Sequence, residues 1–322
     1  MRGPLSQPPL VFVPASTTKA AGGESSFLHG HGRFRELASW RERVLASLER
    51  AMRGTVAARE AVLKLKGDDL AEATQKDLGI RSAGLTMPAV ERYRGVVYQH
   101  LDWSTLPESA RRRLQDHIVI VDGLYGLVAP ADEIPDYRLG IDATLPDLGK
   151  LSDFWREALA PALGPLRARR AIWDLLPDSH RKALPKDLGV DLRIEFLDVV
   201  DGEPQKAGAL AKPATGKLLR HLAMDGFTRD VLETFGADGY TLDRERSGPT
   251  EVVYSKPVLR PPPPPTKAKA VAKKAGPKPA PASKPAKATK KAAKPRRSPA
   301  KPQKEAAKRP ARKAAKKPKA AA

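Results

Sequence analysis

Residues 117–126 read His-Ile-Val-Ile-Val-Asp-Gly-Leu-Tyr-Gly, and this stretch decides the fold class of the 322-residue chain. The run from His117 to Val121 is continuous and rich in β-branched residues, which is typical of a strand covered on both faces. Gly123 and Gly126 follow it, and glycines at a strand end let the backbone turn tightly or approach another group closely. The stretch therefore predicts a buried strand that leads into a tight turn.

Strand and helix patterns alternate on either side of this stretch. Apolar residues at helical spacing predict helices, and short apolar runs predict strands. The predicted helices are 34–52, 56–65, 69–77, one beginning near Pro88, 152–163 and 212–224, and the predicted strands are 10–13, 171–175 and 192–200, with a closing hairpin of 239–243 and 251–255. This alternation predicts a mixed α/β fold (α+β), with a disordered N-terminus over 1–9 and one compact domain over 10–259.

The tripeptide Leu78-Gly79-Ile80 is predicted to separate two helices by a tight turn. Such a turn fits a helix-hairpin-helix element, in which backbone amides near Gly79 contact phosphate. A glycine after a helix is also the usual residue at a helix C-terminus. Both interpretations remain open from the sequence.

The net charge of +21 is concentrated at one end of the chain. Residues 261–322 contain 21 Lys or Arg and one acid, Glu305, whereas residues 1–260 contain 37 Lys or Arg and 36 Asp or Glu. The preceding body is therefore nearly neutral, and it is long enough to bury a substantial core.

Residues 260–322 are predicted to be a disordered polycationic tail, because Lys, Ala and Pro repeat loosely without any aromatic residue. Flexible cations gain affinity for any duplex by releasing counterions, and without aromatic residues to stack on bases, duplex DNA or structured RNA is favoured. The alternatives are a solvated extension that promotes solubility and attraction to anionic membranes. The candidate nucleic-acid contacts in the tail are Lys273, Lys274, Lys290, Lys291, Arg296, Arg297, Lys308, Arg309, Arg312, Lys313, Lys316 and Lys317.

Several function classes lack their sequence signals. The chain has no Cys, which excludes disulfides and thiolate chemistry, and no apolar run reaches the roughly 20 residues that cross a bilayer. His29 and His31 lie in a Gly-rich loop with little support for a metal site, and Asp174, Asp178 and His180 lack an identifiable nucleophile. We therefore expect a cytoplasmic protein without a cofactor, a metal, a membrane partner or a catalytic motif.

Four sequence blocks resemble the YaaA family of peroxide-stress proteins, in an order that spans about residues 10–255. The most specific is a Gly-Leu-Tyr-Gly turn followed at a fixed distance by Pro-x-Tyr-Arg-Leu. The blocks are Pro14-Ala15-Ser16-Thr17-Thr18-Lys19, then Gly123-Leu124-Tyr125-Gly126 with Pro135-Asp136-Tyr137-Arg138-Leu139, then Phe154-Trp155, and finally Ala211-Lys212 through Gly216 to Arg220.

The resemblance implies an α/β fold with a basic cleft, a helix-hairpin-helix element and DNA binding without sequence specificity. It also implies a role in the response to hydrogen peroxide, in which free iron and oxidative DNA damage are limited. The implied cleft cations are Lys19, Arg138, Lys212 and Arg220, to which Lys217 is added from its position on the predicted helix. The positions implied to be structural are Gly123, Tyr125, Gly126, Tyr137 and Gly216.

The chain departs from the commoner family pattern at four positions of these blocks. Ala15 and Thr17 replace a Pro and a Glu, and Pro213 and Thr215 stand where some members have Lys and Arg. The cleft is therefore expected to be less basic, and we hypothesise that the tail supplies the missing phosphate affinity and holds the protein at the nucleoid.

Two further alternatives remain open at the cleft. Arg138 either binds an anion, as the fork of an Arg side chain can, or forms an ion pair with Asp136 or Asp142. The rival function is an enzyme that acts on a phosphate-containing small molecule around Lys19, Arg138 and Lys212.

Overall fold

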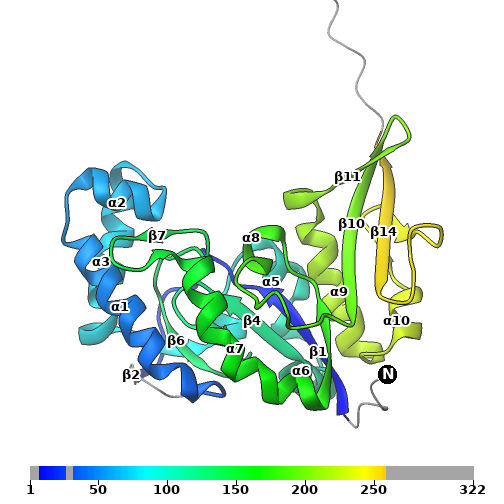
Figure 1. The fold of residues 1–322 in the computed structure, drawn as a ribbon, viewed down its shortest axis with the longest axis horizontal. Coiled ribbons are helices and arrows are strands. Elements are labelled where there is room, and N and C mark those ends of the chain that lie inside the picture. The colour runs from blue at the N-terminus through cyan, green and yellow to red at the C-terminus, as the bar shows by residue number, and fades with distance from the viewer. Residues whose placement is uncertain (1–6, 27–31, 259–322) are drawn as a thin grey trace, which may run out of the picture. The chain divides into compact units, whose positions relative to one another are not determined.

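The computed structural model describes residues 7–26 and 32–258, which belong to one compact unit ending at Pro262. The main sheet of this part has nine strands in the order β12-β13-β14-β10-β9-β1-β4-β5, with β11 paired to β10 (Figure 1). Neighbours from β14 to β4 run parallel, while β5, β11, β12 and β13 pair antiparallel. The strands are β1 (Gln7–Pro14), β4 (Ile118–Asp122), β5 (Gly126–Val128), β9 (Arg170–Asp174), β10 (Leu192–Val200), β11 (Glu203–Lys206), β12 (Gly236–Ala237), β13 (Tyr240–Leu242) and β14 (Glu251–Val258).

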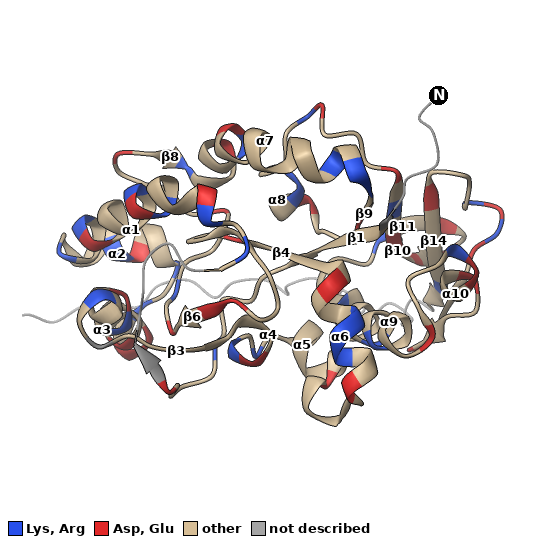
Figure 2. Ribbon diagram, turned by 90° about the horizontal axis from the view of Figure 1, so that it is seen from below, with Lys and Arg blue, Asp and Glu red and all other residues tan. Residues whose placement is uncertain are grey.

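Helices cover both faces of this sheet, which confirms the mixed α/β fold. In Figure 2, α7 lies on one side of β1 and β4, and α5, α6 and α9 lie on the other. Every residue of β4 is buried, as its β-branched composition predicts. The helices are α1 (Ala38–Met52), α2 (Val56–Leu63), α3 (Gly67–Ala83), α4 (Ala89–Arg92), α5 (Val96–Leu101), α6 (Glu108–His117), α7 (Leu151–Arg169), α8 (Asp178–Arg181), α9 (Lys212–Asp225) and α10 (Arg229–Glu233), with short 3-10 turns at Arg35–Leu37, Trp103–Thr105 and Gly208–Ala211.

Two small sheets flank the main one. The first has the order β2-β3-β6, and the second pairs β7 with β8. Their strands are β2 (Ser25–Ser26), β3 (Leu85–Pro88), β6 (Glu133–Pro135), β7 (Thr144–Leu145) and β8 (Gly149–Lys150). These strands have two to four residues each, too few to show a sequence period.

The prediction of a turn at Gly79 is wrong. Helix α3 continues through this position to Ala83, because its buried positions, including Leu70, Asp77 and Ile80, recur at helical spacing past the glycine. The helix predicted from Pro88 is also interrupted, since α4 ends at Arg92 and α5 begins at Val96. The three residues from Lys64 to Lys66 connect two consecutive helices, α2 and α3.

Candidate functional site

The main cavity of the described residues lies at the carboxyl ends of two neighbouring parallel strands, β1 and β9, whose following segments lead to opposite sides of the sheet. Strand β1 lies between β9 and β4. The chain leaves β1 for β4 on one side and leaves β9 for β10 on the other, so the segments that follow β1 and β9 diverge. Ligands of open α/β sheets bind in the crevice that such a switch point creates at the carboxyl ends of the strands.

This cavity has a volume of about 660 Å³. Residues 14–18, from the last residue of β1 onward, and residues 175–181 after β9 line it, so both diverging segments contribute. The first turn of α5, Lys206, the 3-10 turn before α9 and the start of α9 also line it, and Gly123, residues 139–142 and part of β10 complete the walls. The volume is in the range of clefts that hold small molecules.

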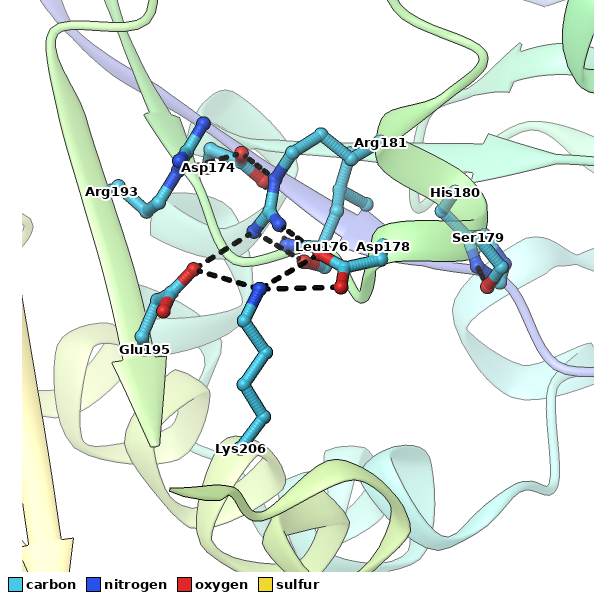
Figure 3. A network of polar contacts seen from close by, with 9 residues as sticks. All are labelled: Asp174, Leu176, Asp178, Ser179, His180, Arg181, Arg193, Glu195 and Lys206. Atoms are coloured by element: carbon cyan, nitrogen blue, oxygen red, sulfur yellow. Dashed lines mark hydrogen bonds and ion pairs between the residues drawn. The ribbon is translucent and has the colours of Figure 1, made fainter. Parts of the chain in front are cut away.

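One wall carries a network of ion pairs (Figure 3). Asp174 is fully buried at the end of β9, and its Oδ2 lies 2.5 Å from the Nε of Arg181. Arg181 also contacts Asp178 at 2.6 Å, and the Nζ of Lys206 lies 3.0 Å from Asp178 and 3.6 Å from Glu195. The hydrogen bond from Lys206 lowers the pKa of Asp178. The cations of this wall are therefore matched by acids.

Neutral polar groups and one lysine lie elsewhere in the same cavity. Burial lowers the pKa of His180 to about 4 although the charges of Asp122 and Asp142 oppose this shift, so this imidazole is neutral at pH 7. The Oγ of Ser179 lies 3.2 Å from the Nδ1 of His180. Lys212 begins α9 with an exposed side chain that forms no ion pair with any described residue. Figure 3 shows Ser179 and His180 on the far side of α8 from the ion-pair network.

Lys19 does not line the cavity but points into the protein behind it. Its Nζ lies 3.7 Å from the centre of the Tyr137 ring and donates to the backbone oxygen of Ser16 at 3.0 Å. Burial lowers the pKa of Lys19 to about 8, although Asp122 and Asp77 oppose this shift. These contacts with Ser16 and Tyr137 hold the segment that follows β1 in position.

Two carboxylates complete the buried cluster around Lys19. Asp122 accepts a hydrogen bond from the hydroxyl of Tyr93 at 3.0 Å, and its other oxygen accepts the backbone N–H groups of Leu124 and Tyr125. Asp77 accepts the backbone N–H of Arg138 at 2.7 Å, and burial raises the pKa of Asp77 to about 7. These carboxylates were not identified from the sequence, although Asp77 occupies an inward position of the α3 pattern.

The predicted cleft cations are not gathered at one surface. Of the five, Lys212 lines the cavity, while Lys217 forms an ion pair with Asp238 on the other side of α9. Arg220 donates to the backbone oxygens of Leu101 and Asp102 at 3.2 and 3.0 Å. In Figure 2, Lys and Arg alternate with Asp and Glu along α1, α2 and α3. The described part of the chain therefore shows a mixed charge distribution.

Arg138 forms neither of the two ion pairs considered from the sequence. Asp136 pairs with Lys76 at 3.0 Å, and Asp142 pairs with Lys64. The interpretation of Arg138 as an anion contact remains a prediction.

The positions predicted to be structural lie at close contacts between sequence blocks. A Cβ on Gly123 would lie 2.8 Å from the backbone oxygen of Leu139, so the Gly-Leu-Tyr-Gly turn packs against the Pro-x-Tyr-Arg-Leu block. Gly126 has a φ of +70° and would place a Cβ 2.6 Å from the ring of Trp155. A Cβ on Gly216 would overlap the backbone oxygen of Val97, so α9 packs directly against α5.

Aromatic residues fill the space between these blocks. The Tyr125 and Tyr137 rings lie 5.8 Å apart. Trp155 is fully buried and its Nε1 donates to the backbone oxygen of Gly123 at 2.8 Å, as expected of a core residue. Trp173 is also buried.

Some predicted residues lie outside the described ranges. They are His29, His31 and all the candidate cations of 261–322. Within residues 7–26 and 32–258, no group of three His, Cys, Asp or Glu could hold a metal ion. None of the helices described here is long and apolar enough to span a membrane.

Comparisons with known proteins confirm the resemblance. The sequence profile of the family described as peroxide stress protein YaaA matches residues 13–246. A UPF0246 protein of Streptomyces coelicolor is 30% identical over 242 residues, which cover 73% of this chain and 92% of that protein. A UPF0246 protein of Corynebacterium glutamicum is 30% identical over 67% of this chain and 85% of its own length, and one of Lacticaseibacillus paracasei is 31% identical over 52% and 69%.

Proposed function

This chain belongs to the family of the peroxide stress protein YaaA, and we propose that it protects DNA during peroxide stress by binding duplex DNA without sequence preference. In this proposal, residues 261–322 provide most of the contacts with phosphates and keep the protein at the nucleoid. The protein also helps to limit free iron and the oxidative DNA damage that iron causes. No catalytic step is assigned to it.

The observation that carries the proposal is the division of charge along the chain. Residues 261–322 hold 21 Lys or Arg with one acid, whereas the preceding residues are nearly balanced. Each phosphate that a cation neutralises releases condensed counterions, which makes binding favourable at low salt and independent of sequence.

The ion pairs of the body support the same assignment. The described residues pair Lys217 with Asp238, and Arg181 and Lys206 with acids of the cavity wall. A cation already paired with an acid gains less from a phosphate, because the existing ion pair has to be broken. The many unopposed cations of residues 261–322 are therefore the stronger candidates for DNA contacts.

The test compares the full chain with a variant in which every Lys and Arg of 261–322 is replaced by Gln. This variant keeps the length of the chain and removes only the charge. In a gel-retardation assay with linear duplex DNA at about 0.1 M salt, we expect its affinity to fall by at least about a hundredfold. Equal affinity of the two proteins would contradict the proposal.

Duplex RNA of the same length serves as the second probe in this assay. It presents the same phosphates, so comparable binding at equal salt would show that the charges act on either polymer. Survival of cells that carry either protein after hydrogen peroxide treatment then relates binding to protection. Equal survival would contradict the protective role.

A further inference from the structure

The cavity at the switch point is too small to hold double-stranded DNA. Its volume of about 660 Å³ suits a molecule of a few rings, whereas a duplex could touch only its mouth. It lies between the segments that follow β1 and β9, away from the charges of residues 261–322 in the sequence. What occupies it is therefore a separate question from DNA binding.

Among the described residues that line the cavity, one cation, Lys212, forms no ion pair with an acid. Arg181 and Lys206 are matched by Asp178 and Glu195, and Asp142 is paired with Lys64 from outside the cavity. Lys212 has no such partner, and its side chain is exposed at the start of α9. A ligand with one anionic group would complete this charge balance.

Hydroxyl groups that can donate to an anion line the same space. The Oγ of Ser16 accepts the backbone N–H of Thr18 at 3.1 Å, which leaves its own hydrogen free to donate. Ser179 and the exposed Thr17 provide further hydroxyls, and His180 is a neutral group beside Ser179. One ammonium with several hydroxyl donors is a set of groups that suits the oxygens of a phosphate.

Apolar groups line other parts of the cavity. Val97, Tyr98, Ile141 and Leu176 are among its lining residues, and they can cover an uncharged ring. Small-molecule sites combine such apolar surface with a few polar groups that fix orientation.

We propose that this cavity binds a phosphorylated small molecule of about the size of a nucleoside monophosphate, with its phosphate facing Lys212. The proposal is independent of DNA binding by residues 261–322. The ion pairs that join α8, β10 and β11 hold another part of the cavity wall in place, and the hydroxyls of Ser16 and Ser179 orient the phosphate.

The experiment uses the full chain and the four ribonucleoside 5′-monophosphates, with the unphosphorylated nucleosides as matched probes. Calorimetry at about 0.3 M KCl screens the interaction of a single phosphate with residues 261–322. We expect one of the monophosphates to saturate a single site and its nucleoside to bind at least tenfold more weakly. Failure of all four to saturate a site would overturn the proposal.

Two lysine variants locate the site. Lys212→Ala is expected to weaken the binding monophosphate at least tenfold, whereas Lys217→Ala, in the same helix but paired with Asp238 outside the cavity, is expected to leave it unchanged. Thermal unfolding of each variant without ligand shows that the fold is retained. Equal losses in the two variants, or no loss in Lys212→Ala, would overturn the assignment to this cavity.

Discussion

Gly126 combines a backbone requirement with a packing requirement at a single residue. Its φ of +70° strains any residue with a Cβ, and that Cβ would lie 2.6 Å from the Trp155 ring. We predict that Gly126→Ala lowers the free energy of unfolding by about 2–4 kcal/mol, the sum of backbone strain and overpacking. Urea unfolding followed by tryptophan fluorescence measures this loss.

Gly149 is the matched control for this substitution. It has the same φ of +70°, but a Cβ there would meet no atom within 4 Å. Gly149→Ala is therefore expected to cost only the backbone strain, about 1–2 kcal/mol. Equal losses at the two positions would show that contact with Trp155 contributes nothing.

Asp77 makes the stability of the protein depend on pH. Burial raises its pKa in the folded state to about 7, while an unfolded Asp titrates near 4. Between these values the folded state binds more protons than the unfolded state, so this group lowers stability as the pH rises from about 4 to 7.

We predict that Asp77→Asn removes this dependence, because Asn keeps an oxygen that can accept the Arg138 N–H. The stability of the wild type relative to the variant should fall by about 2–4 kcal/mol between pH 4 and pH 7.5. Denaturant unfolding at several pH values measures the difference. A difference that does not change with pH would show that Asp77 is charged throughout this range.

Residues whose role follows from their type could be predicted from the sequence, whereas residues whose role follows from their surroundings could not. Gly123 and Gly126 were predicted because a glycine at a strand end usually marks a tight turn or a close approach of the backbone. Lys19 was predicted as a cleft cation, but its ammonium lies over the Tyr137 ring. Its direction is set by the Tyr137 ring, more than a hundred positions away, together with the nearby backbone oxygen of Ser16, and a local sequence pattern cannot show the distant partner.

At the scale of elements, the local sequence around Gly79 predicts a turn, but the helical pattern of the surrounding residues determines the structure. The tripeptide around it is typical of a turn, yet α3 continues from Gly67 to Ala83. We predict that Gly79→Ala stabilises the protein by about 0.5–1 kcal/mol, because a Cβ there meets no atom within 4 Å and alanine favours the helix interior. Thermal unfolding measures the change. A loss of stability would support a turn at this position.

The elements predicted from the sequence are those in which the pattern of apolar residues repeats over a long stretch. Strand β10 and helices α1, α7 and α9 were predicted to within a few residues at most boundaries, because their apolar positions repeat over several turns or pleats. The strands of the two small sheets were missed. Strands of two to four residues depend on partners from distant parts of the chain, such as the pairing of β3 with β6.

At the scale of the whole molecule, the resemblance implied a cleft with Lys212 in it, but the walls of the cavity could not be predicted from the sequence. The cavity is assembled from segments as distant as residues 14–18 and Thr215, and its position follows from the strand order. The unequal distribution of charge along the chain, by contrast, follows from composition alone and can be seen without knowledge of the fold. The sequence therefore predicted a polyanionic partner more directly than it predicted any pocket.

The proposed mode of DNA binding predicts how affinity depends on salt. Each phosphate that the protein neutralises contributes about −0.9 to the slope of log K against log salt concentration. Ending the chain at Ala293 removes 12 of the 21 cations of residues 261–322. We expect the magnitude of the slope to fall by roughly half, as measured by fluorescence anisotropy with a labelled duplex.

A full-length protein in which the order of residues 261–322 is shuffled should keep both affinity and slope, because the contacts depend on charge and not on sequence. If the shuffled protein loses affinity while its charge is unchanged, a specific motif in this segment, and not its charge density, recognises the DNA.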